Sequence, residues 1–598
     1  MESILTQISQ HVQNAVKEHI GQTINEQQIQ IQKTRKDFNG DFTVVVFPLL
    51  KLFKLKPEQC AQKIGEYLVS HLDLIEQFNI VKGFLNLEIS DKYWHDFLNA
   101  VNRTKNFGFT EKQANSNPIM VEYSSPNTNK PLHLGHIRNN LLGYAICSIL
   151  QGNGYDVVKS NLVNDRGIHI CKTMLAWQKW GQGETPESSN KKGDHLVGDY
   201  YVMFENKYKK QVDDLKANGM DEKEAMQTAP LIKEAREMLK QWEDGEEHVV
   251  SLWKKMNDWV YKGFDETYER LGVDFDKIYY ESQTYTKGRD IVLKGLKDGV
   301  LEQQEDGSVW ADLTAEGYDK KLLLRSDGTS VYMTQDIGTA VMRYEEYKPE
   351  AILYVVGNEQ DYHFNILPLI LKKLGYEWGD KIKHLSYGMV DLPSGKMKSR
   401  EGKVVDADDL MDEMIETAGN MSQELGKLEG YSPEEKTSII NTIGMGALKY
   451  FILKVDPKKN MTFNPEESVD FNGNTGPFIQ YTYARIQSVL RKARERNIDI
   501  PDESNKTLQF IDSEKEVLKP MHALPEVIAE SGATFNPGII ANHIYELVKQ
   551  YNQFYQDTPI LRNDNEEMIK MRLLLSKNTA AIIKSSARLL GMDMPPRM

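Results

Sequence analysis

The amino-acid sequence predicts a mixed α/β protein in three parts: a small α/β domain, a central parallel sheet covered by helices, and an all-helical tail. Two observations lead to this prediction. Short apolar strands alternate with helical patterns between residues 110 and 405, as is typical of parallel sheets with crossover helices. From about residue 406, strand signals largely vanish and helical periodicity dominates. A chain of 598 residues is long enough for three or four domains, each with its own core.

Residues 1–110 are expected to form the small α/β domain. Its predicted elements are a helix over 4–20, a strand over 42–50, a helix over 57–72 and a strand around 83–87. The polar segment that follows, up to residue 117, is expected to be a linker.

Residues 117–405 are expected to form a Rossmann-type domain. A strand over 119–123, a helix over 137–150 and a strand over 156–163 make up its first βαβ unit. Because a ligand of such a sheet binds at the carboxyl ends of the strands, where the strand order switches, we expect the functional site at that edge.

A charged, mostly helical insertion interrupts this domain from about residue 181 to 277. The second half of the sheet is expected to resume with strands over 278–282, 352–356 and 385–392.

The tail divides into connecting helices over 406–465 and an all-helical domain over 466–598. Its clearest helix starts after Asn536, a plausible cap, with Pro537 in the first turn and an apolar stripe beyond.

Composition describes an ordinary water-soluble protein, with 40% hydrophobic and 27% charged residues. No apolar run approaches the roughly 20 residues that span a bilayer, and the first ten residues do not resemble a secretion signal, so we expect a cytoplasmic protein without a membrane partner. Cys60, Cys147 and Cys171 are widely spaced, which argues against a disulfide framework and a structural metal site.

Two imidazoles flank a glycine where the first strand of the sheet leads into a helix, in the sequence His133-Leu134-Gly135-His136. The amides and dipole of a helix start favour a bound phosphate, and the imidazoles can donate hydrogen bonds as charge develops on it. Gly135 lets a flat base approach the backbone. The alternative interpretation of this motif alone is a capped helix start with one buried imidazole.

A glycine-bounded basic loop lies far downstream at residues 395–402, after the last predicted strand. Its lysines can supply point charges for a pyrophosphate. Taken alone, such a run is usually a solvated turn. Paired with the histidine motif, it indicates a nucleoside triphosphate site.

Five ordered motifs resemble those of the class I aminoacyl-tRNA synthetases, and of the arginyl-tRNA synthetases in particular. The resemblance covers nearly the whole chain. The motifs are residues 121–127 (VEYSSPN), 133–136 (HLGH, similar to HIGH), 332–336 (YMTQD), 396–400 (KMKSR, similar to KMSKS) and 476–486 (GPFIQY to ARI).

The sequence departs from the family pattern in two places. The usual second lysine of the KMSKS pattern falls on Ser399, with Lys398 displaced by one position. Similar arginyl enzymes carry a lysine just before HIGH, and we expect Lys130 to substitute here. Residues 161–167 stand where many relatives have a Gly-Asp-Trp-Gly run, which leaves the role of 164–167 open.

The resemblance implies that ATP and arginine react to an adenylate, from which arginine passes to the terminal ribose of tRNA, with release of AMP and pyrophosphate. Mg²⁺ would assist with ATP, and no structural metal is expected. The residues implied to stabilise charge on the phosphates are His133, His136, Lys130 and Lys396. Those implied to hold ATP are Gly135, Met397, Lys398, Ser399 and Arg400.

An arginine pocket needs carboxylates in the plane of the guanidinium and an aromatic wall. Tyr332 and Asp336 are four residues apart, so in a helix over 330–344 they share a face. The family pattern adds Glu122 and Asn127, beside the first strand, and Gln360.

A net charge of −14 and a pI near 5.6 argue against a nucleic-acid binder as a whole, but local charge can differ. Lysines and arginines recur at helical spacing in the tail, and a solvated face is the alternative interpretation. The resemblance makes the tail an anticodon-binding domain and the first domain a tRNA contact, and implies a monomer. The implied tRNA contacts are Tyr545, Tyr555, Arg485 and Lys584.

Three other functions stay open. A small nucleotidyltransferase shares the histidine motif but does not need the helical tail. A class I synthetase for another amino acid would keep both ATP motifs and change the pocket. A catalytically silent tRNA-binding relative is compatible with the altered basic loop.

Overall fold

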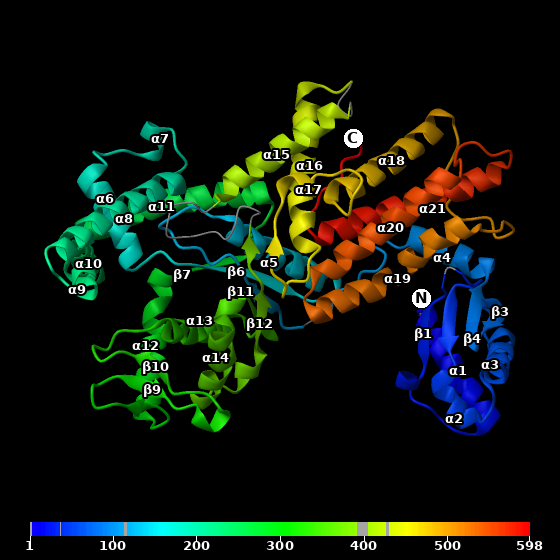
Figure 1. Ribbon diagram of the computed structural model, residues 1–598, viewed down its shortest axis with the longest axis horizontal. Coiled ribbons are helices and arrows are strands. Elements are labelled where there is room, and N and C mark those ends of the chain that lie inside the picture. Colours follow the sequence, from blue (N-terminus) through cyan, green and yellow to red (C-terminus); the bar gives the residue numbers. More distant parts are fainter. Residues whose placement is uncertain (1–2, 36, 113–115, 392–404, 426–429) are drawn as a thin grey trace.

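The protein is described by a computed structural model that covers residues 3–35, 37–112, 116–391, 405–425 and 430–598 (Figure 1). The small N-terminal unit lies at one end, and the helical tail lies between it and the parallel sheet (Figure 1). Among the described residues, no helix combines the length and the apolar character that a bilayer crossing requires.

The N-terminal unit is a four-stranded antiparallel sheet of order β1-β2-β4-β3 with helices packed on it. The predicted strand over 42–50 is too long, because Pro48 has a fixed φ and no N–H and the chain turns there into a 3₁₀ helix. Its elements are α1 (Ile4–Ile20), β1 (Gln30–Lys33), β2 (Phe42–Val45), α2 (Leu50–Phe53), α3 (Pro57–His71), β3 (Ile75–Val81), β4 (Phe84–Ile89) and α4 (Asp91–Arg103).

The central sheet has five parallel strands in the order β12-β11-β5-β6-β7. The strand order switches between β5 and β11, as the Rossmann-type prediction requires. Its elements are β5 (Ile119–Glu122), α5 (Leu134–Gly152), β6 (Val157–Val163), β7 (Lys277–Tyr280), α12 (Glu281–Lys297), α13 (Tyr332–Tyr347), β11 (Ala351–Gly357), α14 (Asp361–Lys373) and β12 (Ile382–Tyr387).

The strand predicted over 278–282 is wrong in two respects. β7 ends at Tyr280, two residues early, and α12 begins at Glu281. β7 also pairs with β6, so it closes the first half of the sheet and does not open the second. The pairing runs from Ser160–Lys277 to Val163–Tyr280 and places β7 at the edge of the sheet beside β6. The chain returns there after the insertion.

The predicted helical insertion is confirmed, and α8 and α11 are long helices that pack on each other (Figure 1). Its elements, with α6 just before it, are α6 (Ile168–Trp180), α7 (Pro186–Ser189), α8 (Gly193–Ala217), α9 (Glu222–Thr228), α10 (Pro230–Glu243) and α11 (Glu247–Leu271). A second, smaller insertion was not predicted; it is an antiparallel sheet of β8 (Glu302–Gln303), β9 (Val309–Ala311) and β10 (Lys321–Leu324).

The tail is helical as predicted, apart from β14, which pairs with β13 ahead of it. The helix predicted after Asn536 is α20, and the Asn536 side chain accepts from the Gly538 amide at 3.0 Å. The elements are β13 (Val390–Asp391), α15 (Ala407–Glu424), α16 (Pro433–Leu453), β14 (Met461–Thr462), α17 (Pro465–Ser468), α18 (Gly476–Glu495), α19 (Asp512–Thr534), α20 (Pro537–Asp557) and α21 (Glu566–Leu589).

The helix α5 joins the sheet to the tail, and most of its residues are buried. One flank packs on β5, where a Cβ on Gly143 would come within 2.3 Å of the Tyr123 side chain. Other flanks contact α16, α19, α20 and α21 of the tail. The three cysteines are free and buried, as expected for small core residues.

Replacing Gly143 by Ala should therefore lower the apparent Tm, because the added methyl group overpacks the contact with Tyr123 at a cost of about 1–3 kcal/mol. Gly419→Ala is the matched control, since a Cβ there meets Ile440 at an ordinary 3.4 Å in a helix where alanine is favoured. Thermal unfolding followed by circular dichroism measures both. Equal Tm values for the two variants would contradict the role given to Gly143.

Candidate active site

The histidine motif forms the first turn of α5, directly after the loop that follows β5. The Nδ1 atom of His133 accepts from the Gly135 amide at 3.1 Å, and the Nδ1 atom of His136 accepts from the His133 amide at 3.2 Å. The two ring centroids are 3.9 Å apart. Since both Nδ1 atoms accept, a neutral ring carries its proton on Nε2, where it can be donated to a ligand.

Burial keeps both imidazoles neutral near pH 7. It lowers the pKa of His133 to about 4 and the pKa of His136 well below its usual value, and the nearby positive charge of Lys130 lowers both further. Burial also lowers the pKa of Lys130. The helix start is thus capped, in agreement with the alternative interpretation of the motif. It also presents the neutral Nε2–H donors of both histidines beside the cation Lys130.

The chain returns to this motif directly after residue 404. The Leu134 amide donates to the Val405 carbonyl at 3.1 Å, and the Ala407 amide donates to the Leu132 carbonyl at 3.0 Å. His133 and Asp406 face each other in this antiparallel bridge. The predicted basic loop, with Lys396, Met397, Lys398, Ser399 and Arg400, lies outside the described residues, but the segment that follows it is fixed at the histidine motif.

The residues predicted to bind arginine lie at the carboxyl edge of the sheet. Glu122 ends β5 and is buried, with one oxygen accepting from the Ser125 hydroxyl at 3.1 Å. Its carboxylate also pairs with Arg343, which is fully buried beside the rings of Tyr279 and Tyr354. Glu122 therefore already has a cationic partner within the protein.

The other predicted pocket residues are more accessible. Tyr332 is the first residue of α13 and is 73% exposed, and Asp336 follows one turn later, as expected. Asp336 accepts from His363 Nε2 at 2.5 Å. Gln360 is exposed between β11 and α14, and Asn127 is exposed in a parallel bridge with Asn164.

The sequence analysis missed Glu281, the first residue of α12. Its pKa is raised to about 8, mainly by burial and also by the negative charges of Asp336, Asp165 and Glu122, against a lowering by Arg166. A carboxylate in such surroundings favours a bound cation. A signal for Glu281 would have been an acid directly after a strand of the parallel sheet, but the strand predicted over 278–282 included Glu281.

Residues 164–167, whose role the sequence left open, fix the position of Glu281. The Asp165 carboxylate accepts from the Ser282 amide at 2.9 Å and from its hydroxyl at 2.7 Å. Arg166 lies 3.8 Å above the Tyr285 ring and pairs with Glu243 of the insertion at 2.8 Å. The segment therefore holds the first turn of α12 against the end of β6.

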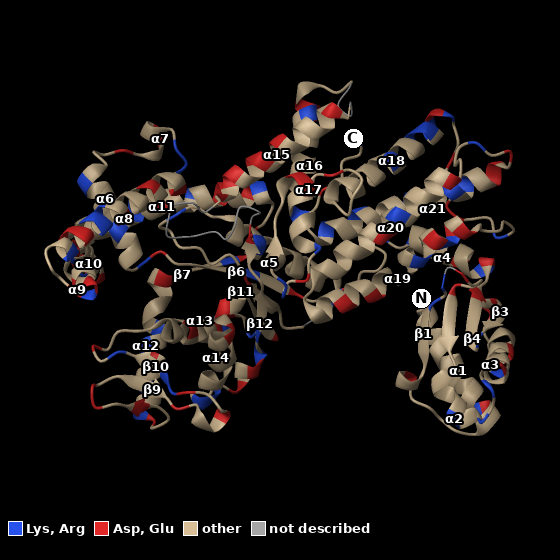
Figure 2. Ribbon diagram, viewed as in Figure 1, with Lys and Arg blue, Asp and Glu red and all other residues tan. Residues whose placement is uncertain are grey.

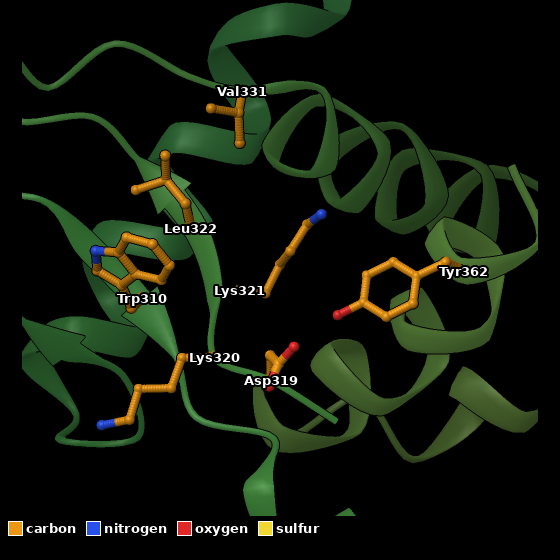
Figure 3. Close-up of a pocket in the computed structure, with 7 residues that line it drawn as sticks. All are labelled: Trp310, Asp319, Lys320, Lys321, Leu322, Val331 and Tyr362. Atoms are coloured by element: carbon orange, nitrogen blue, oxygen red, sulfur yellow. The ribbon is translucent and has the colours of Figure 1, made fainter. Parts of the chain in front are cut away.

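A separate open pocket of about 390 Å³ lies between the small sheet and the start of α14 (Figure 3). Lys321 points into it, with its amine 5.4 Å from the Tyr362 ring, and Trp310 forms the opposite wall (Figure 3). Val331 also lines the pocket and precedes Tyr332. The pocket adjoins the candidate arginine site but contains none of its predicted residues.

The predicted tRNA contacts lie on the tail helices, where Lys and Arg gather on α18 and α21 (Figure 2). Lys584 is exposed on the otherwise mostly buried helix α21, so the predicted basic face is solvent-accessible. Arg485 lies between the rings of Tyr481 and Tyr555, at 4.8 and 5.1 Å, and Tyr555 is 38% exposed. Tyr545 is half-buried against Phe478.

Comparison with known families gives three matches in chain order. Residues 6–89 match the arginyl tRNA synthetase N-terminal domain, residues 99–464 match the catalytic domain of class I (R) tRNA synthetases, and residues 479–598 match the DALR anticodon-binding domain.

Relatives and solved structures agree with these matches. The chain is 56% identical to the arginine–tRNA ligase of Parabacteroides distasonis over 99% of both chains, and 54% identical to that of Porphyromonas gingivalis over the full length of both. Its fold is similar over the full length to arginyl-tRNA synthetases of Thermus thermophilus (TM-score 0.79, 23% identity) and Plasmodium falciparum (TM-score 0.75, 21% identity).

The parallel sheet, with a histidine-capped helix after its first strand, is that of a class I tRNA synthetase. The chain belongs to the arginyl-tRNA synthetase family.

The raised pKa of Glu281 predicts a pH-dependent stability. An acid whose folded pKa lies above its unfolded value stabilises the protein fully below the unfolded pKa, and this contribution is lost as pH rises through about 8. Glu281→Gln removes that loss, so its Tm should exceed the wild-type Tm by a margin that grows from pH 5 to pH 8. Asp290→Asn, an exposed acid on the same helix, should show no such trend. A constant margin for Glu281→Gln would contradict the assignment.

Proposed function

We propose that this synthetase joins arginine to tRNA in two displacements at the carboxyl edge of the sheet. The arginine carboxylate attacks the α-phosphorus of ATP and expels pyrophosphate. The terminal ribose hydroxyl of tRNA then attacks the carbonyl of the adenylate and releases AMP. The observation that supports this proposal best is that neutral Nε2 donors at the start of α5 and an acid of raised pKa, Glu281, at the start of α12 both follow strands of the same parallel sheet.

In the first displacement, the protein stabilises charge and positions the reactants. The Nε2–H groups of His133 and His136 donate to phosphate oxygens, and Lys130 supplies positive charge beside them. Lys396 on the basic loop is a further cation for the pyrophosphate, and Met397, Lys398, Ser399 and Arg400 are the further ATP-binding residues that the resemblance implies. Gly135 leaves room for the base. Mg²⁺ accompanies ATP as part of the substrate.

The arginine pocket combines Glu122, Asn127, Tyr332, Asp336 and Gln360 with Glu281, which we add to the predicted set. Two carboxylates, Glu281 and Asp336, offer planar acceptors to a guanidinium. His363 already orients Asp336 through the 2.5 Å hydrogen bond. Because Arg343 neutralises Glu122, we assign Glu122 to the α-amino end of the substrate through its remaining acceptor positions.

The tail supplies the tRNA contacts. Tyr555 is an exposed ring with Arg485 above it, an arrangement that suits stacking on an unpaired base. Lys584 on α21 suits a phosphate, and Tyr545 is a second candidate ring.

We also propose the domain limits 1–110, 117–405, 406–465 and 466–598, with the helical insertion over 181–277. The enzyme acts as a monomer. Because protein synthesis is cytoplasmic, so is the enzyme. The family assignment removes the small nucleotidyltransferase from the alternatives, and the experiment below separates an active enzyme from a silent tRNA-binding relative.

Arginine-dependent exchange of pyrophosphate into ATP, measured with tRNA present, tests the proposal. Wild type should support exchange with arginine and with no other amino acid. Glu281→Gln should raise the KM for arginine by about 30-fold or more, since losing one member of a buried charge pair costs at least about 2 kcal/mol. The KM for ATP should change little.

Asp290→Asn is the matched control, because it removes one exposed carboxylate from the same helix. Its kinetic constants should equal those of wild type. No exchange by wild type with any amino acid would exclude the enzyme, and an unchanged KM for arginine in Glu281→Gln would exclude the pocket.

A further inference from the structure

The first turn of α15 is held by basic side chains of the helical insertion. The Nζ atom of Lys192, which precedes α8, lies 2.6 Å from the Asp408 carboxylate. Arg270, in the last turn of α11, lies 2.8 Å from the same carboxylate and also pairs with Asp412. The acidic start of α15 accordingly lies against the end of α11 (Figure 2). We call Lys192, His195 and Arg270, with their three aspartates on α15, the insertion clamp.

Among the contacts of the insertion clamp, the one made by His195 lies nearest the histidine motif. Its Nε2 atom is 3.2 Å from Asp406 and 3.6 Å from Asp408. Asp406 caps α15 by accepting from the Asp408 amide at 2.8 Å, and its backbone bridges to His133. Contacts therefore run from the insertion through Asp406 to the backbone of His133.

The helix α8 also contacts the segment ahead of the histidine motif. A Cβ on Gly198, one turn after His195, would lie 2.8 Å from Pro131 Cδ and 3.7 Å from the Cα atom of Lys130. The stretch of α8 from His195 to Gly198 thus lies against two segments. One is the segment just before His133, and the other is the segment at Asp406 that bridges to it.

The charges around His195 are balanced without an added ion. Asp194 accepts from the His195 amide at 3.1 Å and pairs with Lys192 at 3.2 Å. Although Asp194, His195 and Asp408 lie within 4.8 Å of one another, the Lys192 amine already occupies both carboxylates. The Asp406 and Asp408 carboxylates beside its Nε2 atom raise the pKa of His195 to about 10, so the imidazole is charged near pH 7.

We propose that His195 is a positioning residue for the ATP reaction: through Asp406 it holds the backbone of His133, and through α8 it holds Lys130. The first turn of α8 then supports the active site. This inference rests on the proposed function. It predicts a loss in kcat for adenylate formation, because misplacing a phosphate donor by about 1 Å can cost 100-fold in rate.

His195→Ala tests the proposal in the full chain, with His248→Ala as the control. His248 is an exposed histidine of the same insertion, in the first turn of α11. In pyrophosphate exchange with tRNA present, His195→Ala should lower kcat about 10- to 100-fold while the KM for arginine stays within about twofold. His195→Gln keeps a donor for Asp406 and should recover most of the lost kcat. An equal kcat for His195→Ala and His248→Ala would overturn the proposal.

Hydrogen exchange followed by mass spectrometry provides a readout that needs no activity. The amides of Leu134 and Ala407 form the bridge beside His133, so peptides over 130–140 and 405–412 should exchange faster in His195→Ala and at the wild-type rate in His248→Ala. Unchanged exchange would overturn the proposal even if the enzyme is active. Faster exchange in an enzyme that uses no amino acid would keep the positioning contact and overturn the proposed function.

Discussion

The site depends on α5 being unable to move. Arg138 is fully buried and donates to the carbonyls of Met389, Pro457 and Lys459, which ties α5 to the β13–β14 pair. The side chain of the next residue, Asn139, accepts from the Ser124 amide at 2.5 Å and donates to the Val355 carbonyl at 2.7 Å, so it joins the ends of β5 and β11. Because these contacts hold α5 in place, they also fix the positions of the two imidazoles in its first turn.

The carboxyl edge of the sheet has two regions of different charge. In the proposed mechanism, each region faces one end of the arginine substrate. Uncharged Nε2 donors and Lys130 surround the start of α5, where a carboxylate and phosphates react. Acidic side chains surround the starts of α12 and α13, where Glu281 has a pKa raised by its neighbours. An arginine molecule is negative at its carboxylate and positive at its guanidinium, so this asymmetry alone favours one orientation over its reverse. The net charge of −14 is therefore no obstacle to a phosphate site, because the local field is set by a few buried groups.

Much of the fold followed from the sequence where periodicity was strong. The helix from Ile4 to Ile20, the parallel sheet and the capped helix after Asn536 were all predicted correctly. Glu281 was missed because an apolar run does not reveal whether a strand ends two residues early. The pairing of Glu122 with Arg343 was also out of reach, since it joins residues far apart in the chain, and no periodicity encodes which buried charges meet.

The contacts of the insertion show that sequence motifs alone do not reveal every residue that supports a site. Lys192 and His195 lie in a charged stretch whose composition suits any solvated helix, and the acids of α15 look like an ordinary helix start with favourable dipole contacts. Only the fold brings the two together, with Asp406 at their junction beside His133. Surface ion pairs contribute little, but Asp406 and Asp408 are largely shielded and hydrogen-bonded, so their geometry is more strongly determined. In the proposed mechanism, the position of the His133 backbone thereby depends on residues of the insertion that do not touch the substrate.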